Sequence, residues 1–220
     1  AANIPPGSAT ARYYLGNAYQ QDNKAEQAAL AWVEALRLDP KLVQAKLALA
    51  KLKLDSGETN DAIRYAEDAL KENPNSLEAR ISIGNGYMQK KDFKKAGEFF
   101  EAAVKQYPNS ATAMQQLGSA YLAQGDLTKA EMQFNAALRN DPSNIGAVAS
   151  LASVYLGQKN PDKAIQRLSA QIAQFPKQSG LYQVLGEIYF SQKNYAKAEE
   201  AYRKALSSDG NNLAIYGLLG

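Results

Sequence analysis

The chain has 220 residues, with 25 lysines and arginines against 22 aspartates and glutamates, and therefore a net charge of +3. It contains no cysteine and no histidine, which excludes disulfides, thiolate nucleophiles and thiolate zinc sites and removes the commonest general base. A charge this small does not indicate a nucleic-acid partner. The first eight residues lack the basic start and apolar stretch of a signal peptide. This composition is compatible with the cytoplasm and with the bacterial cell envelope, so the compartment stays unknown.

A 34-residue repeat organises the sequence. The strings Leu15-Gly-Asn-Ala-Tyr19, Leu117-Gly-Ser-Ala-Tyr121 and Leu185-Gly-Glu-Ile-Tyr189 are spaced by whole multiples of this period, without insertions. After an N-terminal extension, 1–8, the repeats are 9–42, 43–76, 77–110, 111–144, 145–178, 179–212 and the beginning of a seventh, 213–220. Apolar and small residues recur three or four apart in both halves of each repeat, which predicts two helices per repeat.

Several positions have the same kind of residue in nearly every repeat. The small residues of the first halves are Gly16, Ala50, Gly84, Gly118, Ala152 and Gly186. Three residues later the aromatic residues are Tyr19, Tyr87, Tyr121, Tyr155 and Tyr189, and Lys53 is the exception. Alanine recurs in the second halves at 28, 62, 96, 130, 164 and 198. Small residues at a helix crossing allow a close approach, and aromatic rings fill the space beside it.

The helix ends can be predicted in chain order. First helices are expected to begin after the N-cap residues Ser8, Ser76, Ser110, Asn144 and Asn212, and second helices after Asp92, Asp126, Asn160 and Asn194. In the fourth repeat the two helices are predicted at 111–123 and about 127–140. Pro161 is expected at a first helical position. Gly57 and Gly125 are expected to end first helices, and prolines or Gly210 close the repeats.

A 34-residue helix–turn–helix with these residues resembles the tetratricopeptide repeat (TPR) family. The resemblance covers 9–212 completely and 213–220 in part. It implies an all-α fold, a right-handed α-solenoid of antiparallel helix pairs whose first helices line a concave groove. The departures from the family pattern are Lys53, Ala66 and Gln171. The family also implies a non-catalytic scaffold that binds a peptide or helix of a partner protein in the groove.

Two rows of side chains are candidates for binding within that groove. The apolar row consists of Leu54, Met88, Leu122, Leu156 and Phe190, at one position of five successive repeats. The amide row consists of Asn17, Asn85, Gln115 and Gln183, and Tyr13 precedes Asn17 by one helical turn. Amides can pair with a peptide backbone of any sequence, and apolar side chains offer pockets for its side chains. Alternatively, the apolar row packs against the next repeat and the amides face solvent.

Other classes of function have less support. The sequence has no phosphate-binding glycine loop, zinc signature or nucleophile elbow, so we expect no enzyme, no cofactor and no metal. The acid pairs Glu67-Asp68 and Glu199-Glu200 point in different directions on a helix. The lysines around Phe93 (Lys90, Lys91, Lys94 and Lys95) are interrupted by Asp92 and Glu98, so no nucleic-acid partner is expected. No apolar run is long enough to insert directly into a membrane.

A structural role is the alternative to groove binding. The seventh repeat stops after eight residues, without the polar capping helix of native solenoids. We therefore expect a fragment of a larger protein, whose contacts could be made through the array ends. The same feature predicts end-to-end self-association. The identity of the partner cannot be predicted from these residues.

Overall fold

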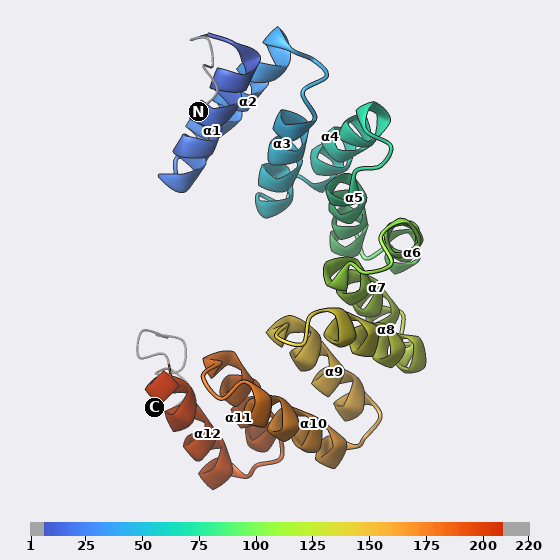
Figure 1. Ribbon diagram of the computed structural model, residues 1–220, viewed down its shortest axis with the longest axis vertical. Helices are drawn as coiled ribbons and strands as arrows, with labels where there is room; N and C mark the ends of the chain where they lie inside the picture. The colour runs from blue at the N-terminus through green and yellow to red at the C-terminus, as the bar shows by residue number, and fades with distance from the viewer. Residues whose placement is uncertain (1–6, 209–220) are drawn as a thin grey trace. The chain divides into compact units, whose positions relative to one another are not determined.

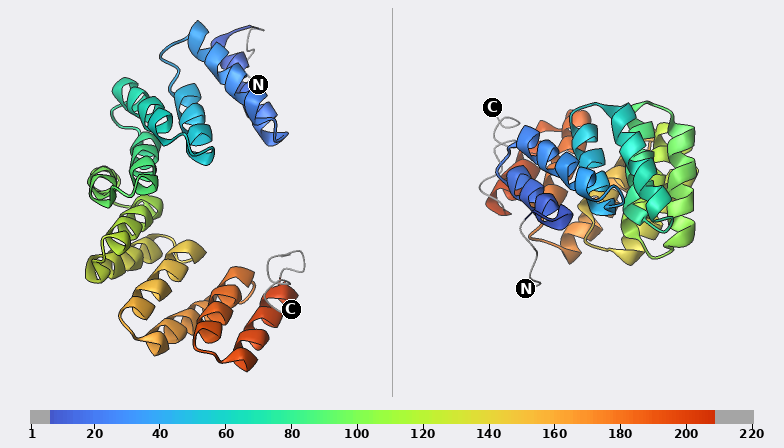
Figure 2. Two further views of the ribbon diagram at one scale, coloured as in Figure 1. Left: turned by 180° about the vertical axis from the view of Figure 1, so that it is seen from behind. Right: turned by 90° about the horizontal axis from the view of Figure 1, so that it is seen from above.

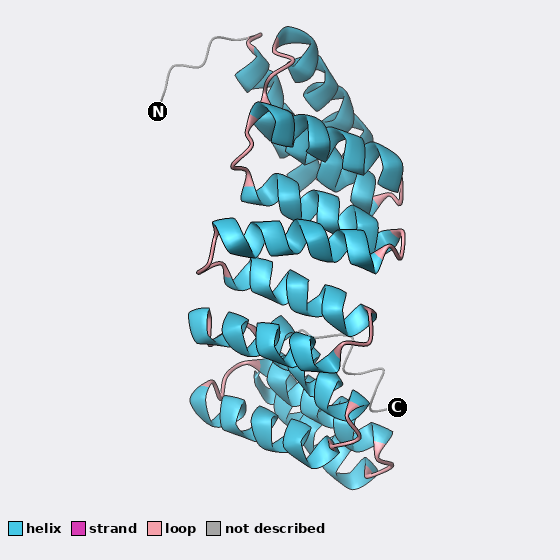
Figure 3. Cartoon of the chain, turned by 90° about the vertical axis from the view of Figure 1, so that its right-hand side faces the viewer, coloured by secondary structure: helices cyan, strands magenta, loops and turns pink. Residues whose placement is uncertain are grey.

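The computed structural model describes residues 7–208, which form twelve α-helices joined by short loops, with no strand in that range (Figure 3). The all-α prediction is therefore confirmed. The predicted start of a seventh repeat at 213–220, the cap at Asn212 and Gly210 lie outside the described residues. The chain divides into two compact units, Ala1–Pro108 and Asn109–Gly220, and Figure 1 labels the helices of each. Each is described separately.

Each unit contains three pairs of neighbouring helices (Figure 2). Unit 1 contains α1 (Ala9–Gln21), α2 (Ala25–Leu38), α3 (Val43–Asp55), α4 (Thr59–Glu72), α5 (Leu77–Gln89) and α6 (Phe93–Gln106). Unit 2 contains α7 (Ala111–Ala123), α8 (Leu127–Asn140), α9 (Ile145–Gly157), α10 (Pro161–Gln174), α11 (Ser179–Ser191) and α12 (Tyr195–Ser208). Every pair falls within one 34-residue repeat, so odd-numbered helices are the first helices and even-numbered ones the second helices.

Side-chain caps fix the helix starts that the sequence predicts. The side chains of Ser8, Ser76, Ser110 and Asn144 each accept a hydrogen bond from the backbone N–H three residues later. Asp92, Asp126, Asn160 and Asn194 do the same for second helices. At Asp126 the bond from Lys129 N is 3.0 Å long, and Lys129 Nζ lies 3.1 Å from the carboxylate. The backbone bond first, and then the ammonium group, hold the pKa of Asp126 below its ordinary value.

Left-handed residues make the turn between the two helices of each repeat. Positive φ angles occur at one position in all six repeats, namely Asn23, Gly57, Lys91, Gly125, Lys159 and Lys193. Gly57 and Gly125 adopt this conformation without steric cost. The three lysines have φ between 57° and 60° and carry a Cβ that crowds the backbone there. The remaining prediction of the turn, Pro161 at the start of α10, is also confirmed.

In the core of each repeat, the size of a residue on the first helix is matched to the size of the side chain that faces it from the second helix. A Cβ placed on Gly16, Gly84, Gly118 or Gly186 would lie less than 3.0 Å from the ring of Trp32, Phe100, Phe134 or Tyr202, respectively. Where the first helix has alanine, at Ala50 and Ala152, the equivalent second-helix residues are the smaller Ala66 and Leu168. Ala66, a departure from the family pattern, is thus matched by Ala50.

Four of the five recurring tyrosines of the first helices lie close to a lysine of the second helix in the same repeat. The ammonium groups of Lys95, Lys129, Lys163 and Lys197 are 4.2–5.4 Å from the ring centroids of Tyr87, Tyr121, Tyr155 and Tyr189. These distances permit cation–π attraction within each repeat. The second repeat has Lys53 in place of tyrosine, and its ammonium group forms an ion pair with Glu58 at 2.6 Å.

Candidate functional site

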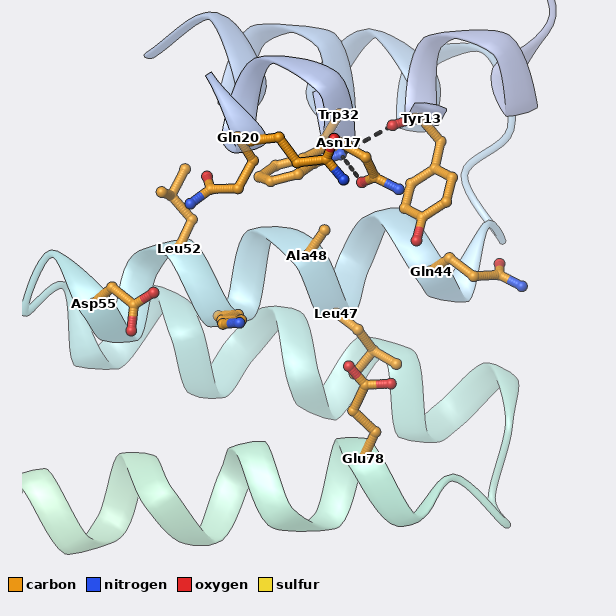
Figure 4. A pocket seen from close by; sticks show the side chains of 12 residues that line it. Tyr13, Asn17, Gln20, Trp32, Gln44, Leu47, Ala48, Leu52, Asp55 and Glu78 are labelled. Atoms are coloured by element: carbon orange, nitrogen blue, oxygen red, sulfur yellow. Dashed lines mark hydrogen bonds between the residues drawn. The ribbon is translucent and has the colours of Figure 1, made fainter. Parts of the chain in front are cut away.

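A cavity of about 350 Å³ opens in unit 1 between α1 and α3 (Figure 4). Its lining residues come from α1, α3 and α5 and, through Trp32, from α2: Tyr13, Asn17, Gln20, Gln21, Trp32, Gln44, Leu47, Ala48, Lys51, Leu52, Asp55 and Glu78. The next first helices, α3 and α5, pack against one another, whereas α1 makes hardly any contact with α3. The cavity occupies this less tightly packed junction between the first and second repeats.

The indole of Trp32 forms one wall of the cavity and is held by two hydrogen bonds. Its Nε1 donates to the backbone oxygen of Tyr13 at 3.2 Å and to Oδ1 of Asn17 at 3.1 Å (Figure 4). Gly16 gives the ring the room to reach both acceptors, because any Cβ there would overlap the indole. The side chain of Trp32 is 3% exposed. Asn17 thus uses its oxygen inside the protein and keeps its Nδ2 donors for other partners.

The cavity combines an apolar interior with a polar rim. Leu47 is buried, and Ala48 and Leu52 are half-buried, so they supply apolar surface beside the indole. Gln20 and Gln44 are polar amides at the rim, and the charged lining residues are Lys51, Asp55 and Glu78. Such a cavity can take up an apolar side chain while amides pair with the adjacent peptide backbone.

The residues of the apolar row have different surroundings. Leu54, Met88, Leu122 and Leu156 are half-buried. Phe190 is 55% exposed and packs edge-on against Tyr195 of α12, with 5.4 Å between the ring centroids. Leu54 does not line the cavity around Trp32. Leu156 lines a smaller cavity of about 140 Å³ between α9 and α11 in unit 2.

The amides of the second row differ in their partners. In unit 2, Oε1 of Gln115 accepts from Nδ2 of Asn144 at 2.9 Å, and Nε2 of Gln183 donates to Glu187 Oε1 at 3.1 Å. The half-buried Asn85 makes no side-chain hydrogen bond among residues 7–208. Most of these amides are therefore already engaged in hydrogen bonds within the protein.

Trp32, which the sequence reasoning did not single out, is a principal wall of the cavity. A signal for it existed, because it is the only tryptophan of the chain and occupies a position that is phenylalanine, tyrosine, leucine or alanine in the other repeats. Over residues 7–208, no group of three acidic side chains is placed to hold a metal ion. No helix in the same range is long and apolar enough to cross a membrane.

The capped helix pairs, the 34-residue repeat and the small-residue contacts define a TPR protein, an α-solenoid used for protein–protein interaction. Members of this class are typically non-catalytic scaffolds. Residues 1–219 match the sequence family described as the cilia and flagella-associated protein 70 C-terminal domain, and the chain belongs to that family. None of the curated protein sequences matches the chain.

Solved structures with the same fold share little sequence with the chain. A tetratricopeptide repeat protein from Parabacteroides merdae is 23% identical, with a TM-score of 0.77 over 99% of this chain and 84% of its own. A chain of the APC/C hetero-tetramer Cut9-Hcn1 is 19% identical (TM-score 0.75), and the match covers 97% of this chain but only 42% of the other. YrrB, a TPR protein with an unusual peptide-binding site, is 19% identical (TM-score 0.56), covering 86% and 98%.

Proposed function

We propose that the chain binds an extended segment of a partner protein on the face of its first helices, with one apolar side chain held in the cavity around Trp32. The observation that carries the proposal is the cavity itself. Its volume of about 350 Å³ lies in the range of ligand pockets, about 300–1,000 Å³. It lies between first helices, where a partner can approach without separating a helix pair.

The chemistry of the lining supports a peptide rather than a free ion or a cofactor. Tyr13 and the Nδ2 group of Asn17 border the indole, and the amides of Gln20 and Gln44 offer further donors and acceptors. Among the structural neighbours, YrrB has a peptide-binding site and another chain belongs to the Cut9-Hcn1 hetero-tetramer. These relatives make a protein partner the natural expectation for the same fold.

The remaining residues of the two rows extend the proposed surface beyond the cavity. The apolar members are Leu54, Met88, Leu122, Leu156 and Phe190, and the amide members are Asn85, Gln115 and Gln183. Their apolar side chains would contact alternate side chains of an extended segment. Contacts of this kind spread the binding energy over several repeats.

The cavity can be tested with a displayed library of random peptides selected against the immobilised chain. Two variants address the site: Ala48→Phe fills the cavity, and Lys51→Glu reverses a charge at its rim. The matched control, Ala170→Phe, adds the same ring to an exposed position of α10. We expect the selected peptides to lose affinity for both cavity variants and to keep it for the control. Peptides that bind all four proteins equally would refute the cavity as the site.

The apolar row needs a separate test. The double variant Met88→Glu/Leu122→Glu places a carboxylate in one row position of each unit, and circular dichroism would check its helix content. We expect the same selected peptides to bind this variant at least about ten-fold more weakly, since apolar contacts are replaced by charges. Unchanged affinity would restrict the binding site to the cavity and remove the row from it.

A second function, docking through the end of the array, is favoured by one observation. The first repeat exposes large apolar side chains on α1 and α2, with Leu30 70%, Val33 48% and Leu15 38% exposed. The counterparts of Leu15 in later repeats, such as Leu49 and Ile83, are completely buried. An apolar face of this kind can be covered by another helix pair, which would make the chain self-associate or continue a longer array.

Sedimentation velocity over a concentration series tests end docking. We expect a mass that rises with concentration for the native chain and a constant monomer mass for Leu30→Glu/Val33→Glu. Ala173→Glu, on the surface of α10, controls for added charge. A constant monomer mass for the native chain at the highest concentration would argue against end-to-end association.

A further inference from the structure

A second cavity lies on the layer of second helices in unit 2, between α8 and α10, with a volume of about 590 Å³. Met132 and Leu138 of α8 supply its apolar surface, and Met132 is 56% exposed. Arg139 of α8 and Arg167 of α10 supply its positive charge. The cavity belongs to the opposite helix layer from the proposed peptide surface, so it is a separate site.

Arg167 has a buried donor without an acceptor. Its Nε atom is excluded from solvent and has no hydrogen-bond partner within residues 7–208. A buried guanidinium N–H in this condition is destabilising, and native proteins rarely tolerate it without a reason. No other repeat has an arginine here, the equivalent residues being Ala31, Tyr65, Phe99, Gln133 and Ala201. Because the Arg167 side chain lines the cavity, a rotation of the guanidinium would turn this donor toward the acceptor of a bound ligand.

Arg139 lacks the acidic partner that the equivalent residues of the first and second repeats have. At this position Arg37 pairs with Glu34 at 2.8 Å, and Lys71 pairs with Asp68 at 2.8 Å, in each case three residues earlier. The residue three before Arg139 is Ala136, and in the described part of the chain Arg139 forms no ion pair. Neither arginine is therefore neutralised by an acidic side chain among the described residues.

The one acid in the cavity, Glu131, is already engaged. Its Oε1 accepts from Lys163 Nζ at 2.8 Å, and its Oε2 accepts from Gln158 Nε2 at 3.0 Å. The Lys163 ammonium also neutralises its charge, so Glu131 does not repel an incoming anion as a free carboxylate would. The two arginines remain the uncompensated charges of the site.

We propose that this cavity binds an acidic segment of a protein, with an anionic side chain contacting Arg139 and Arg167 and an adjacent aliphatic side chain on Met132. Guanidinium groups bind carboxylates and phosphates through paired, charge-assisted hydrogen bonds. The flexible thioether of Met132 adapts to aliphatic groups of different shape. The apolar surface between the charges favours a peptide over a nucleic-acid backbone, which would need a continuous basic track.

The arginine Nε–H signals in NMR spectra of the ¹⁵N-labelled chain give a direct readout. Three synthetic peptides serve as probes: alternating Glu and Leu, alternating phosphoserine and Leu, and alternating Gln and Leu as the neutral control. We expect the Arg167 Nε–H signal to shift with the acidic peptides and not with the Gln–Leu peptide. The tighter of the two acidic peptides identifies carboxylate or phosphate as the preferred group.

Two variants assign the effect to the cavity. Arg139→Gln and Arg167→Gln should each weaken the acidic peptide about ten-fold, the usual effect of losing a charged hydrogen bond. Arg203→Gln is the control, because Arg203 lies on α12 and already pairs with Glu199 at 2.7 Å. The proposal would be overturned if neither acidic peptide moved the Arg167 signal, or if the Gln–Leu peptide moved it as much as the acidic peptides do. It would also be overturned if Arg203→Gln weakened binding as much as the two cavity variants. Tighter binding of a single-stranded RNA to the same arginines would also overturn it.

Discussion

The contact between Gly118 and Phe134 allows a quantitative test of the matched core. A Cβ on Gly118 would lie 2.7 Å from Cε1 and 2.8 Å from Cδ1 of a completely buried ring. Carbon atoms in contact are normally about 3.5–4.0 Å apart, and overpacking of a core costs about 1–3 kcal/mol. The gain in helix propensity from glycine to alanine, about 1 kcal/mol, offsets part of this cost. The balance of these two effects predicts that Gly118→Ala destabilises unit 2 by up to about 2 kcal/mol.

A double-mutant cycle provides the sharper measurement. Phe134→Leu recreates the pair that the fifth repeat uses, Ala152 with Leu168. The double variant Gly118→Ala/Phe134→Leu should therefore lose less stability than the two single variants lose in total. We expect the difference to be at least about 1 kcal/mol, because residues in contact are coupled. Urea denaturation monitored by circular dichroism gives the free energies of unfolding.

Gly157→Ala is the matched control, because a Cβ there would meet only the flexible end of Leu127 at 3.3–3.4 Å. It should be neutral or stabilising. If the effects of Gly118→Ala and Phe134→Leu were additive within about 0.5 kcal/mol, the two residues would not be coupled and the size-matching argument would be refuted.

Three further changes test other parts of the structure. Lys159→Gly should raise the free energy of unfolding by about 1 kcal/mol because φ is 57° there, and a loss of stability in urea denaturation would contradict this. Trp32→Phe removes both indole hydrogen bonds and should cost about 1–2 kcal/mol in the same assay; a cost below about 0.5 kcal/mol would show that these bonds contribute little. Asp126→Asn keeps a capping oxygen but removes the carboxylate, whose pKa is lowered in the folded state by the Lys129 hydrogen bonds. The carboxylate therefore stabilises the fold above its unfolded pKa and loses this effect as the pH falls through its folded pKa. The melting temperature of the native chain should exceed that of Asp126→Asn most at about pH 6 and converge with it toward about pH 3, and a constant difference would contradict the lowered pKa.

The helices and most of their ends could be predicted because their determinants recur in most repeats. The cap at Ser110 and the small residue Gly118 are local signals, and their recurrence with the 34-residue period distinguishes them from chance. The cavity could not be predicted in this way. Its wall depends on one residue, Trp32, whose acceptors, the backbone oxygen of Tyr13 and Oδ1 of Asn17, lie on another helix, and the next repeat has Lys51 in place of Asn17.

The contacts of the candidate binding residues could not be predicted from the repeat pattern either. The sequence places Gln115 and Phe190 on the first helices, but their partners depend on single tertiary contacts. Gln115 of α7 pairs with Asn144, the N-cap of α9, and Phe190 packs against Tyr195 in the following helix. Arg167 is a further single-copy residue, and only the structure reveals its unpaired buried Nε. Contacts that occur once leave no periodic pattern in a sequence.

The glycine–ring pairs, such as Gly84 with Phe100 and Gly186 with Tyr202, join the two helices of the same repeat, whereas Gly86 of α5 makes a similarly close contact with Ile63 of α4 in the preceding repeat. Duplication or exchange of a whole repeat therefore carries both members of the pair together and leaves this part of the core intact. Exchange of a single helix can set an alanine against a phenylalanine, or leave a void opposite a glycine. Evolution by recombination, and design by assembly, can consequently keep these pairs intact only by moving the whole 34-residue repeat.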